Sequence, residues 1–146
     1  VDDPHNADPR FARSRVRQTV LPMLERELGP GIADALARTA DLARADTDAL
    51  AELADEVAHD VMSNAAEAGA LDVESLAALS DALRSRVVRL WLVERGCPAG
   101  SLGAEHVGRV VALVTAWKGQ GAVAVPGGVE VARERGMLRV RPTPPR

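Results

Sequence analysis

The longest run of this chain without a helix-breaking residue includes residues 32–67, which contain neither glycine nor proline. Apolar side chains recur in it at every third or fourth position, which places them on one face of an α-helix. Acidic side chains dominate the other faces, as expected for a helix exposed to water on one side. The sequence therefore predicts one long helix and leaves open whether it bends near Asp46–Asp48. Its expected buried stripe is Leu36, Ala40, Ala43, Leu50, Ala54, Val57 and Val61.

A first, shorter helix is predicted over residues 9–28, and the Gly-Pro-Gly sequence at residues 29–31 ends it. Asp8 is a suitable N-cap, and Pro9 occupies the first helical position, where proline is favoured. Pro22 lies in the interior of the segment and is expected to kink or split the helix. The expected buried stripe of this helix is Ala12, Val16, Val20 and Leu24.

The C-terminal half predicts three more helices, followed by strands. The helices are expected over residues 73–79, 81–95 and 103–117. After residue 118 the apolar period changes from near four to two, which is typical of strands. The predicted fold is therefore mainly α, with about five helices including one long helix, and a small C-terminal antiparallel β-hairpin or three-stranded sheet. Asp72 and Ser80 are the expected N-caps, and the expected core includes Leu83, Val87, Leu90, Trp91, Val107, Val110, Val111 and Val114.

Charge is distributed unevenly along the chain, although the net charge is only −3. Residues 10–24 hold four arginines and no acid, and residues 132–146 hold five arginines and one acid. The rest of the chain carries a net negative charge. Two basic patches on an acidic body favour a specific contact with a polyanion over indiscriminate coating of nucleic acid.

Several kinds of site are disfavoured by the sequence. A single cysteine, Cys97, allows no disulfide framework and fits a reducing, cytoplasmic location. The three histidines, His5, His59 and His106, lie far apart in different predicted elements, so no metal site is expected. No stretch approaches about 18 consecutive apolar residues, so no membrane span is expected. The chain begins with valine and is expected to be a piece of a longer protein.

The arginines at the start of the first helix form a pattern with a chemical interpretation. Arg10, Arg13 and Arg17 are spaced i, i+3 and i+7, which places them on one helix face. The N–H groups and the dipole at a helix start also favour anions, and arginine holds phosphate or carboxylate in a fixed geometry. The sequence leaves a structural alternative open, in which the three aspartates within residues 2–8 pair with these arginines.

The same stretch resembles a known family pattern. The motif consists of Asp3-Pro4-His5-Asn6-x-Asp8, Phe11-x-Arg13, Arg17 and Leu21-Pro22-x-Leu24. It is similar to the segment that follows the catalytic domain in tRNA(Ile)-lysidine synthases. The resemblance continues through "ALARTADLARAD", "LRSRVVRLWL" and "WKGQGAVAVPGGVEVARERGMLRV" and so covers nearly the whole chain. Ser14 departs from the pattern, in which asparagine is common after the first arginine.

The resemblance implies a ligase that uses ATP to join L-lysine to C2 of cytidine 34 in a tRNA(Ile) with a CAU anticodon. In that family an N-terminal catalytic domain with an SGGxDS loop binds ATP and Mg²⁺, and these 146 residues contain no such loop. No catalytic residue is therefore expected here, and a homodimer is left open. The implied organisation is a junction from the catalytic domain (1–9), a helical substrate-positioning domain (10–118), a β-hairpin (119–141) and a flexible tail (142–146), without a further C-terminal domain.

Two sets of polar residues are candidate contacts. The resemblance implies that the first set, near the start of the chain, supports tRNA binding or the neighbouring active site. It implies that the second set, on the helix at residues 81–95, faces the tRNA. For the second set, pairing with Asp81 and Glu94 on a solvated helix face is the alternative. Trp117 is expected either to cover the junction between the last helix and the hairpin or to stack on a base. The first set is Asn6, Arg13 and Arg17, and the second is Arg84, Arg86 and Arg89.

Two other functions stay open at this point. Three helices followed by a glycine-rich hairpin are also typical of a winged-helix DNA-binding module, which needs a basic recognition helix. The helix at residues 103–117 has only Arg109, with Lys118 at its end, and also carries Glu105. A structural helical adaptor, whose arginines form internal salt bridges, is the remaining alternative.

Overall fold

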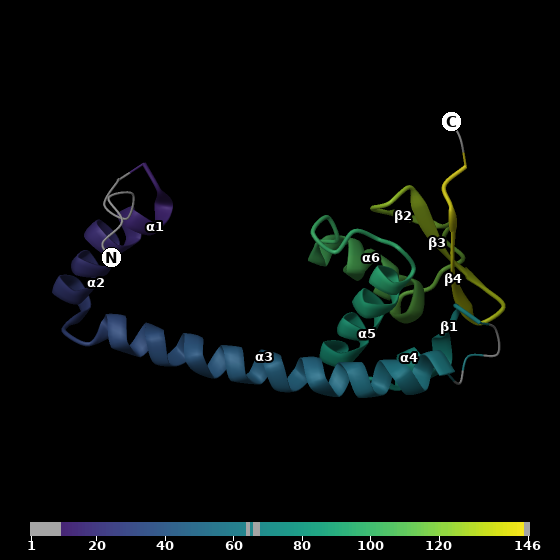
Figure 1. Cartoon of the computed structure of the whole chain (residues 1–146), viewed down its shortest axis with the longest axis horizontal. Helices are drawn as coiled ribbons and strands as arrows, with labels where there is room; N and C mark the ends of the chain where they lie inside the picture. The colour runs from purple at the N-terminus through teal and green to yellow at the C-terminus, as the bar shows by residue number, and fades with distance from the viewer. Residues whose placement is uncertain (1–9, 64, 66–67, 145–146) are drawn as a thin grey trace. The chain divides into compact units, whose positions relative to one another are not determined.

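The chain divides into two compact units in the computed structural model, which describes residues 10–63, 65 and 68–144. The boundary between the units falls between Thr47 and Asp48. The fold is mainly helical with one antiparallel sheet, as the sequence predicts, and its elements can be followed along the chain in Figure 1. They are α1 (Ala12–Arg15), the π-helix η2 (Val16–Val20), α2 (Leu21–Leu28), α3 (Ile32–Ser63), β1 (Leu71–Asp72), α4 (Val73–Ala78), α5 (Asp81–Glu94), α6 (Ala104–Thr115), β2 (Val123–Val125), β3 (Val129–Glu134) and β4 (Met137–Pro142).

The helical segment at residues 12–28 changes its geometry just before Pro22, as the sequence predicts. The change is the π-helical turn η2, in which the Leu21 N–H donates to the Val16 carbonyl, five residues back. Pro22 has no N–H to donate to a carbonyl one turn earlier, and a widened turn accommodates that loss. The predicted N-cap, Asp8, lies outside the described residues.

The long helix predicted over residues 32–67 is present as α3, which ends at Ser63. Its start is capped by a side chain from α2. The Glu25 carboxylate accepts hydrogen bonds from the backbone N–H of Gly31 at 2.7 Å and of Ala33 at 2.8 Å. N–H groups at a helix start have no intrahelical acceptor, so this carboxylate satisfies them and complements the helix dipole.

The predicted buried stripe of α3 is buried only towards its C-terminal end. Ala54 and Val61 belong to the core, whereas Leu36 is 51% exposed and Ala40 and Ala43 are also exposed. Among the described residues of the N-terminal unit, no hydrophobic side chain is buried. The prediction of a continuous buried face is therefore wrong for the described residues, because no described side chains of that unit form a second layer that covers it.

The C-terminal unit contains a four-stranded antiparallel sheet with the strand order β1-β4-β3-β2. The sequence predicted a hairpin or three strands, and β3 and β4 form the hairpin, with Val131 opposite Val140. The additional strand, β1, consists of two residues that pair with Leu138 and Met137. Two residues are too few to show an alternating pattern, so periodicity misses this strand.

Helices α5 and α6 pack with the sheet around one hydrophobic core. Trp91 is fully buried and its indole N–H donates to the Gly69 carbonyl at 3.0 Å, which confirms that it is a core residue. Asp72 caps α4 as predicted, since its carboxylate accepts from the Ser75 N–H at 2.7 Å. Ser80 occupies the N-cap position of α5 without a side-chain capping bond. The largest fully buried side chains are Trp91, Leu71, Leu76, Leu92, Leu113, Leu138, Val87, Val88, Val110 and Val131.

Candidate nucleic-acid interface

Arg13 and Arg17 are exposed on the first helical segment, Arg13 in α1 and Arg17 in η2. Neither guanidinium has a hydrogen-bond or ion-pair partner within the part of the chain that the structure describes. Arg15 differs, because its guanidinium donates to the Arg10 carbonyl at 2.8 Å. Because both guanidinium groups are exposed and have no described partner, they are available to bind an external anion. Asn6, the other predicted member of this set, lies outside the described residues.

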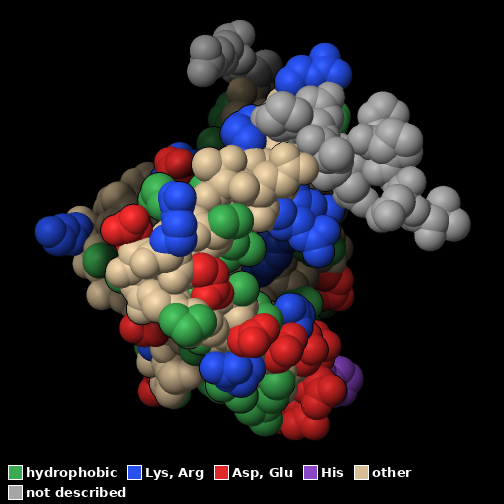
Figure 2. Space-filling view, turned by 90° about the vertical axis from the view of Figure 1, so that its left-hand side faces the viewer, with side chains coloured by type: hydrophobic (Ala, Val, Ile, Leu, Met, Phe, Trp, Pro, Cys, Tyr) green, Lys and Arg blue, Asp and Glu red, His purple; other side chains and the backbone are tan. Residues whose placement is uncertain are grey.

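The hydrophobic residues beside these two arginines are exposed as well. Val16 is 45% exposed and Val20 is 40% exposed, although the sequence predicts both to be buried. Ala12 is exposed and Leu24 is half-buried. The prediction of a buried stripe is therefore wrong here too. Figure 2 shows one face of the molecule, on which hydrophobic, basic and acidic side chains are interspersed. An apolar stripe that no described layer covers is a surface suited to a protein partner.

Ser14 lies at the position where the family pattern commonly has asparagine, and it is buried. Its hydroxyl oxygen has no hydrogen-bond partner among the described residues. A buried hydroxyl without a partner destabilises a fold by about 1–3 kcal/mol. The departure from the pattern therefore replaces a longer amide side chain with a group that makes no polar contact in this structure.

Arg84 is buried, with 7% of its surface exposed, which corrects its assignment to a surface patch. Its guanidinium donates to the carbonyls of Leu76 at 2.8 Å, Ala77 at 3.1 Å and Leu79, and it pairs with Asp81 at 2.6 Å. Carbonyls at the end of a helix lack intrahelical donors, so this arginine satisfies the C-terminal end of α4. Helical geometry explains the error, because residues two apart lie about 200° apart around a helix and cannot share a face.

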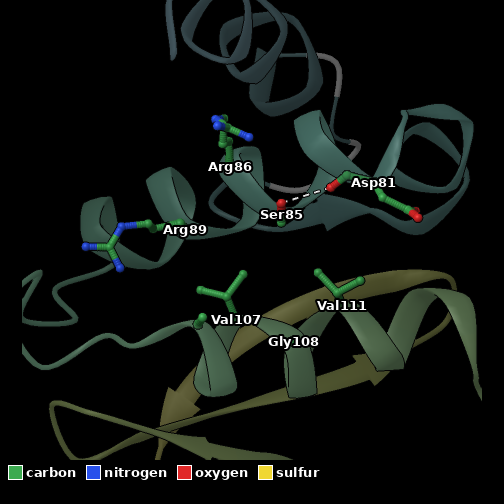
Figure 3. Close-up of a pocket in the computed structure, with 8 residues that line it drawn as sticks. Asp81, Ser85, Arg86, Arg89, Val107, Gly108 and Val111 are labelled. Atoms are coloured by element: carbon green, nitrogen blue, oxygen red, sulfur yellow. Dashed lines mark hydrogen bonds between the residues drawn. The ribbon is translucent and has the colours of Figure 1, made fainter. Parts of the chain in front are cut away.

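Arg86 and Arg89 lie half-buried on α5 and line a hollow between α5 and α6, as Figure 3 shows. Arg86 donates to the Ala82 carbonyl at 3.0 Å. Arg89 donates to the Ala99 carbonyl at 3.0 Å and to the Leu102 carbonyl, which ties α5 to the loop before α6. Carbonyl partners fix the positions of both guanidinium groups without neutralising their charge, so both charges remain available to an anion.

The hollow beside these arginines has a volume of about 500 Å³ and a mainly apolar lining. Val107 and Val111 point from α6 towards α5, and Gly108 lies between them in the sequence (Figure 3). A second hollow, of about 230 Å³, is also lined by Arg86 and Arg89, together with residues of α3 that include Asp55. The two arginines are therefore common to both hollows.

The two arginines of β4, Arg139 and Arg141, are engaged in ion pairs. Arg141 pairs with Glu130 at 2.7 Å and with Glu134 at 2.9 Å, and Arg139 pairs with Glu134 at 3.5 Å. The register of the hairpin places Glu130 directly opposite Arg141. These ion pairs offset part of the C-terminal positive charge, which sequence counting alone does not reveal.

Trp117 is 38% exposed and carries the Arg133 guanidinium over its ring, with the guanidinium carbon 5.2 Å from the ring centroid. Arg133 also donates to the Leu113 carbonyl at 2.9 Å, near the end of α6. Sequence reasoning identified Trp117 but missed Arg133, because only the packing of β3 against α6 brings them together. A cation over one part of an exposed indole is an arrangement that also occurs in nucleic-acid-binding proteins.

The histidines, the cysteine and the acidic residues do not form a catalytic or metal-binding cluster among the described residues. Within the described ranges, no three His, Cys, Asp or Glu side chains are close enough to hold a metal ion. Burial raises the pKa of the Cys97 thiol, so the less reactive thiol form is favoured. The His106 ring accepts from the Gly103 N–H at 3.1 Å and caps α6. Among the helices of the described residues, none has the length and apolar character that crossing a bilayer requires.

Comparison with known proteins relates the chain to one family. Residues 71–139 match the TilS substrate binding domain. The chain is 51% identical to the tRNA(Ile)-lysidine synthase of Salinispora arenicola, over 98% of this chain and 42% of that protein. The synthase of Thermobifida fusca is 49% identical over 94% of this chain and 42% of its own length, and that of Streptomyces coelicolor is 46% identical over 96% and 39%. The chain thus spans about two fifths of the length of these relatives. Residues 71–139 therefore match the TilS substrate binding domain, and nearly the whole chain is similar to part of the tRNA(Ile)-lysidine synthases.

Proposed function

We propose that this chain is the part of a tRNA(Ile)-lysidine synthase that positions the tRNA and supports an active site carried by the rest of the enzyme. The whole enzyme joins L-lysine to C2 of cytidine 34 in the CAU anticodon of tRNA(Ile). The observation that carries this proposal is the identity of 46–51% to synthases over more than nine tenths of the chain. The substrate-binding name of the matched domain supports the positioning role.

Arg13 and Arg17 are assigned the contact with the nucleotide-handling part of the enzyme. Both are exposed and have no polar partner among the described residues. Phosphate contacts of this kind orient a nucleic acid without reading its bases. They support either the tRNA backbone or the phosphates of ATP at the neighbouring active site, and Asn6 is assigned to the same region.

The exposed stripe that includes Val16 and Val20 is assigned to docking on the N-terminal catalytic domain. Burial of exposed aliphatic side chains contributes roughly 25 cal/mol for each Å² removed from water. Arg13 and Arg17 each follow a residue of this stripe by one position, so they border the surface that docks. The same contact that covers the stripe therefore brings these two arginines close to the catalytic domain.

Arg86 and Arg89 are assigned a second contact with the tRNA backbone. Both guanidinium groups are fixed by carbonyl hydrogen bonds and lie at the hollow between α5 and α6. A fixed guanidinium loses less side-chain freedom when it binds a phosphate. Arg84 is left out of this set, because its guanidinium is occupied within the fold.

ATP and Mg²⁺ are assigned to the remainder of the enzyme. The described residues include no cluster of metal-ligating side chains, and the chain lacks the SGGxDS loop. The residues present here therefore do not fit a site for either group. ATP would supply the activation of cytidine 34 at the catalytic domain, and this chain holds the substrate there.

Binding of a tRNA(Ile) transcript with a CAU anticodon to the 146-residue chain tests the proposal. We expect an affinity that falls as salt rises, because phosphate contacts displace counterions. Arg86→Gln should weaken binding and reduce the slope of log affinity against log salt by about one. A DNA duplex of equal length is the control. Tighter binding to that duplex would favour the winged-helix alternative, absence of binding to both would favour the structural adaptor, and either result contradicts the proposal.

A further inference from the structure

Trp117 is an exposed aromatic side chain in a chain that has few aromatics, and it shares this exposure with Phe11. The sequence has two tryptophans, and the other, Trp91, is fully buried. Trp117 remains 38% exposed. Tryptophan is enriched at interfaces because its ring is largely apolar and its N–H is polar, so an exposed indole is a candidate for contact with another molecule.

The backbone on both sides of this indole is held in place. The Ala116 N–H donates to the Ala112 carbonyl at 3.0 Å and ends α6. The Gln120 amide then donates to the Ala116 carbonyl at 3.2 Å and accepts from the Lys118 N–H at 2.6 Å. The exposure of Trp117 is therefore a feature of an ordered turn, which presents the ring in a defined position.

Two cationic residues accompany this ring, one that lies over it and one that follows it in the sequence. The Arg133 guanidinium lies over it and is anchored by the Leu113 carbonyl at 2.9 Å and the Val114 carbonyl at 3.5 Å. Lys118 is the next residue after Trp117, is exposed, and has no side-chain partner within the described residues. An anionic ligand with a flat, polarisable group satisfies both features at once, whereas a neutral apolar peptide would use only the indole.

We propose that Trp117, with Arg133 and Lys118, is a stacking platform for an unpaired nucleobase of the bound RNA. The inference rests on the proposed function and specifies which part of the RNA this surface takes. Bases in a duplex already stack on one another, so only an unpaired base can lie against the indole. Stacking on an aromatic side chain tolerates any base, while the neighbouring cations attract the backbone phosphates. The surface therefore distinguishes single-stranded from double-stranded RNA.

Tryptophan fluorescence of the 146-residue chain tests this inference, with decaadenylate as the single-stranded probe. Because Trp91 is buried, a base that stacks on the protein quenches the Trp117 emission. We expect saturable quenching by decaadenylate and none by a ten-base-pair RNA duplex. Trp117→Leu should abolish the quenching and weaken decaadenylate binding about tenfold, while Trp117→Phe, which keeps an aromatic face, should bind within a few-fold of wild type. The emission of Trp91 reports that each variant is folded.

Two results would overturn the inference. One is decaadenylate binding without quenching, or no binding of decaadenylate at all. The other is equal affinity of the wild type and Trp117→Leu for decaadenylate. If the chain still binds tRNA with the expected salt dependence, either result rejects the platform alone. Loss of tRNA binding by the wild-type chain rejects the proposed function instead.

Discussion

Arginine has several distinct roles among the described residues, and the partners of each guanidinium distinguish them. Arg84 is buried and satisfies the carbonyls that end α4. Arg133 connects the end of α6 to Trp117. Arg13 and Arg17 are exposed without a polar partner among the described residues. Residue type alone does not separate a structural guanidinium from one that is free to bind phosphate, because that difference arises from burial and acceptors.

Replacement of Arg84 tests its structural role. Arg84→Met keeps an unbranched side chain but leaves the buried carbonyl of Leu76 and the more exposed carbonyl of Ala77 without this donor. We expect the free energy of unfolding of the C-terminal unit to fall by about 3 kcal/mol, as measured by urea denaturation. Arg86→Met is the matched control on the same helix and should change stability by less than about 0.5 kcal/mol. Equal effects of the two substitutions would show that Arg84 is not structural.

The elements show how far local sequence determines this fold. The order of the helices, the break of the first helix near Pro22 and the C-terminal hairpin follow from apolar spacing and from glycine and proline, and the structure confirms them. The Glu25 cap on α3 and the two-residue strand β1 do not follow, because each depends on contact with another segment. The stripes of the first helix and of the N-terminal part of α3 have helical spacing but are exposed in this chain. Periodicity identifies a face that needs cover, and it does not identify what covers it.

Hydrogen exchange tests the difference between the helical elements. In the 146-residue chain, backbone amides of α1, η2 and α2 should exchange at least about 100-fold faster than those of α5 and α6, because no described hydrophobic side chain of the N-terminal unit is buried. In the full-length enzyme the same amides should become more protected as the exposed stripe is covered. Comparable protection of the two groups in the 146-residue chain, or no gain in the full-length enzyme, would contradict the docking assignment.

At the scale of the whole molecule, the chain combines a unit with a hydrophobic core and a unit whose apolar surface remains exposed. The family resemblance could be read from the sequence, and the comparisons confirm it over nearly the whole chain. The candidate site could be read only in part. The spacing of Arg13 and Arg17 suggests their role, which stays a prediction, whereas the burial of Arg84 and the pairing of Arg133 with Trp117 can be seen only in the packed helices and sheet.

Lysidine formation by the full-length enzyme tests most directly whether the N-terminal arginines serve the active site. We predict that Arg13→Ala combined with Arg17→Ala lowers kcat/KM for tRNA(Ile) at least tenfold, which corresponds to about 1.4 kcal/mol of activation free energy, without loss of folding. Arg44→Ala is the matched control, because Arg44 is exposed in the same unit and pairs with Asp41. It should leave the rate unchanged. Turnover of cytidine 34 by the double variant at the wild-type rate would contradict the account.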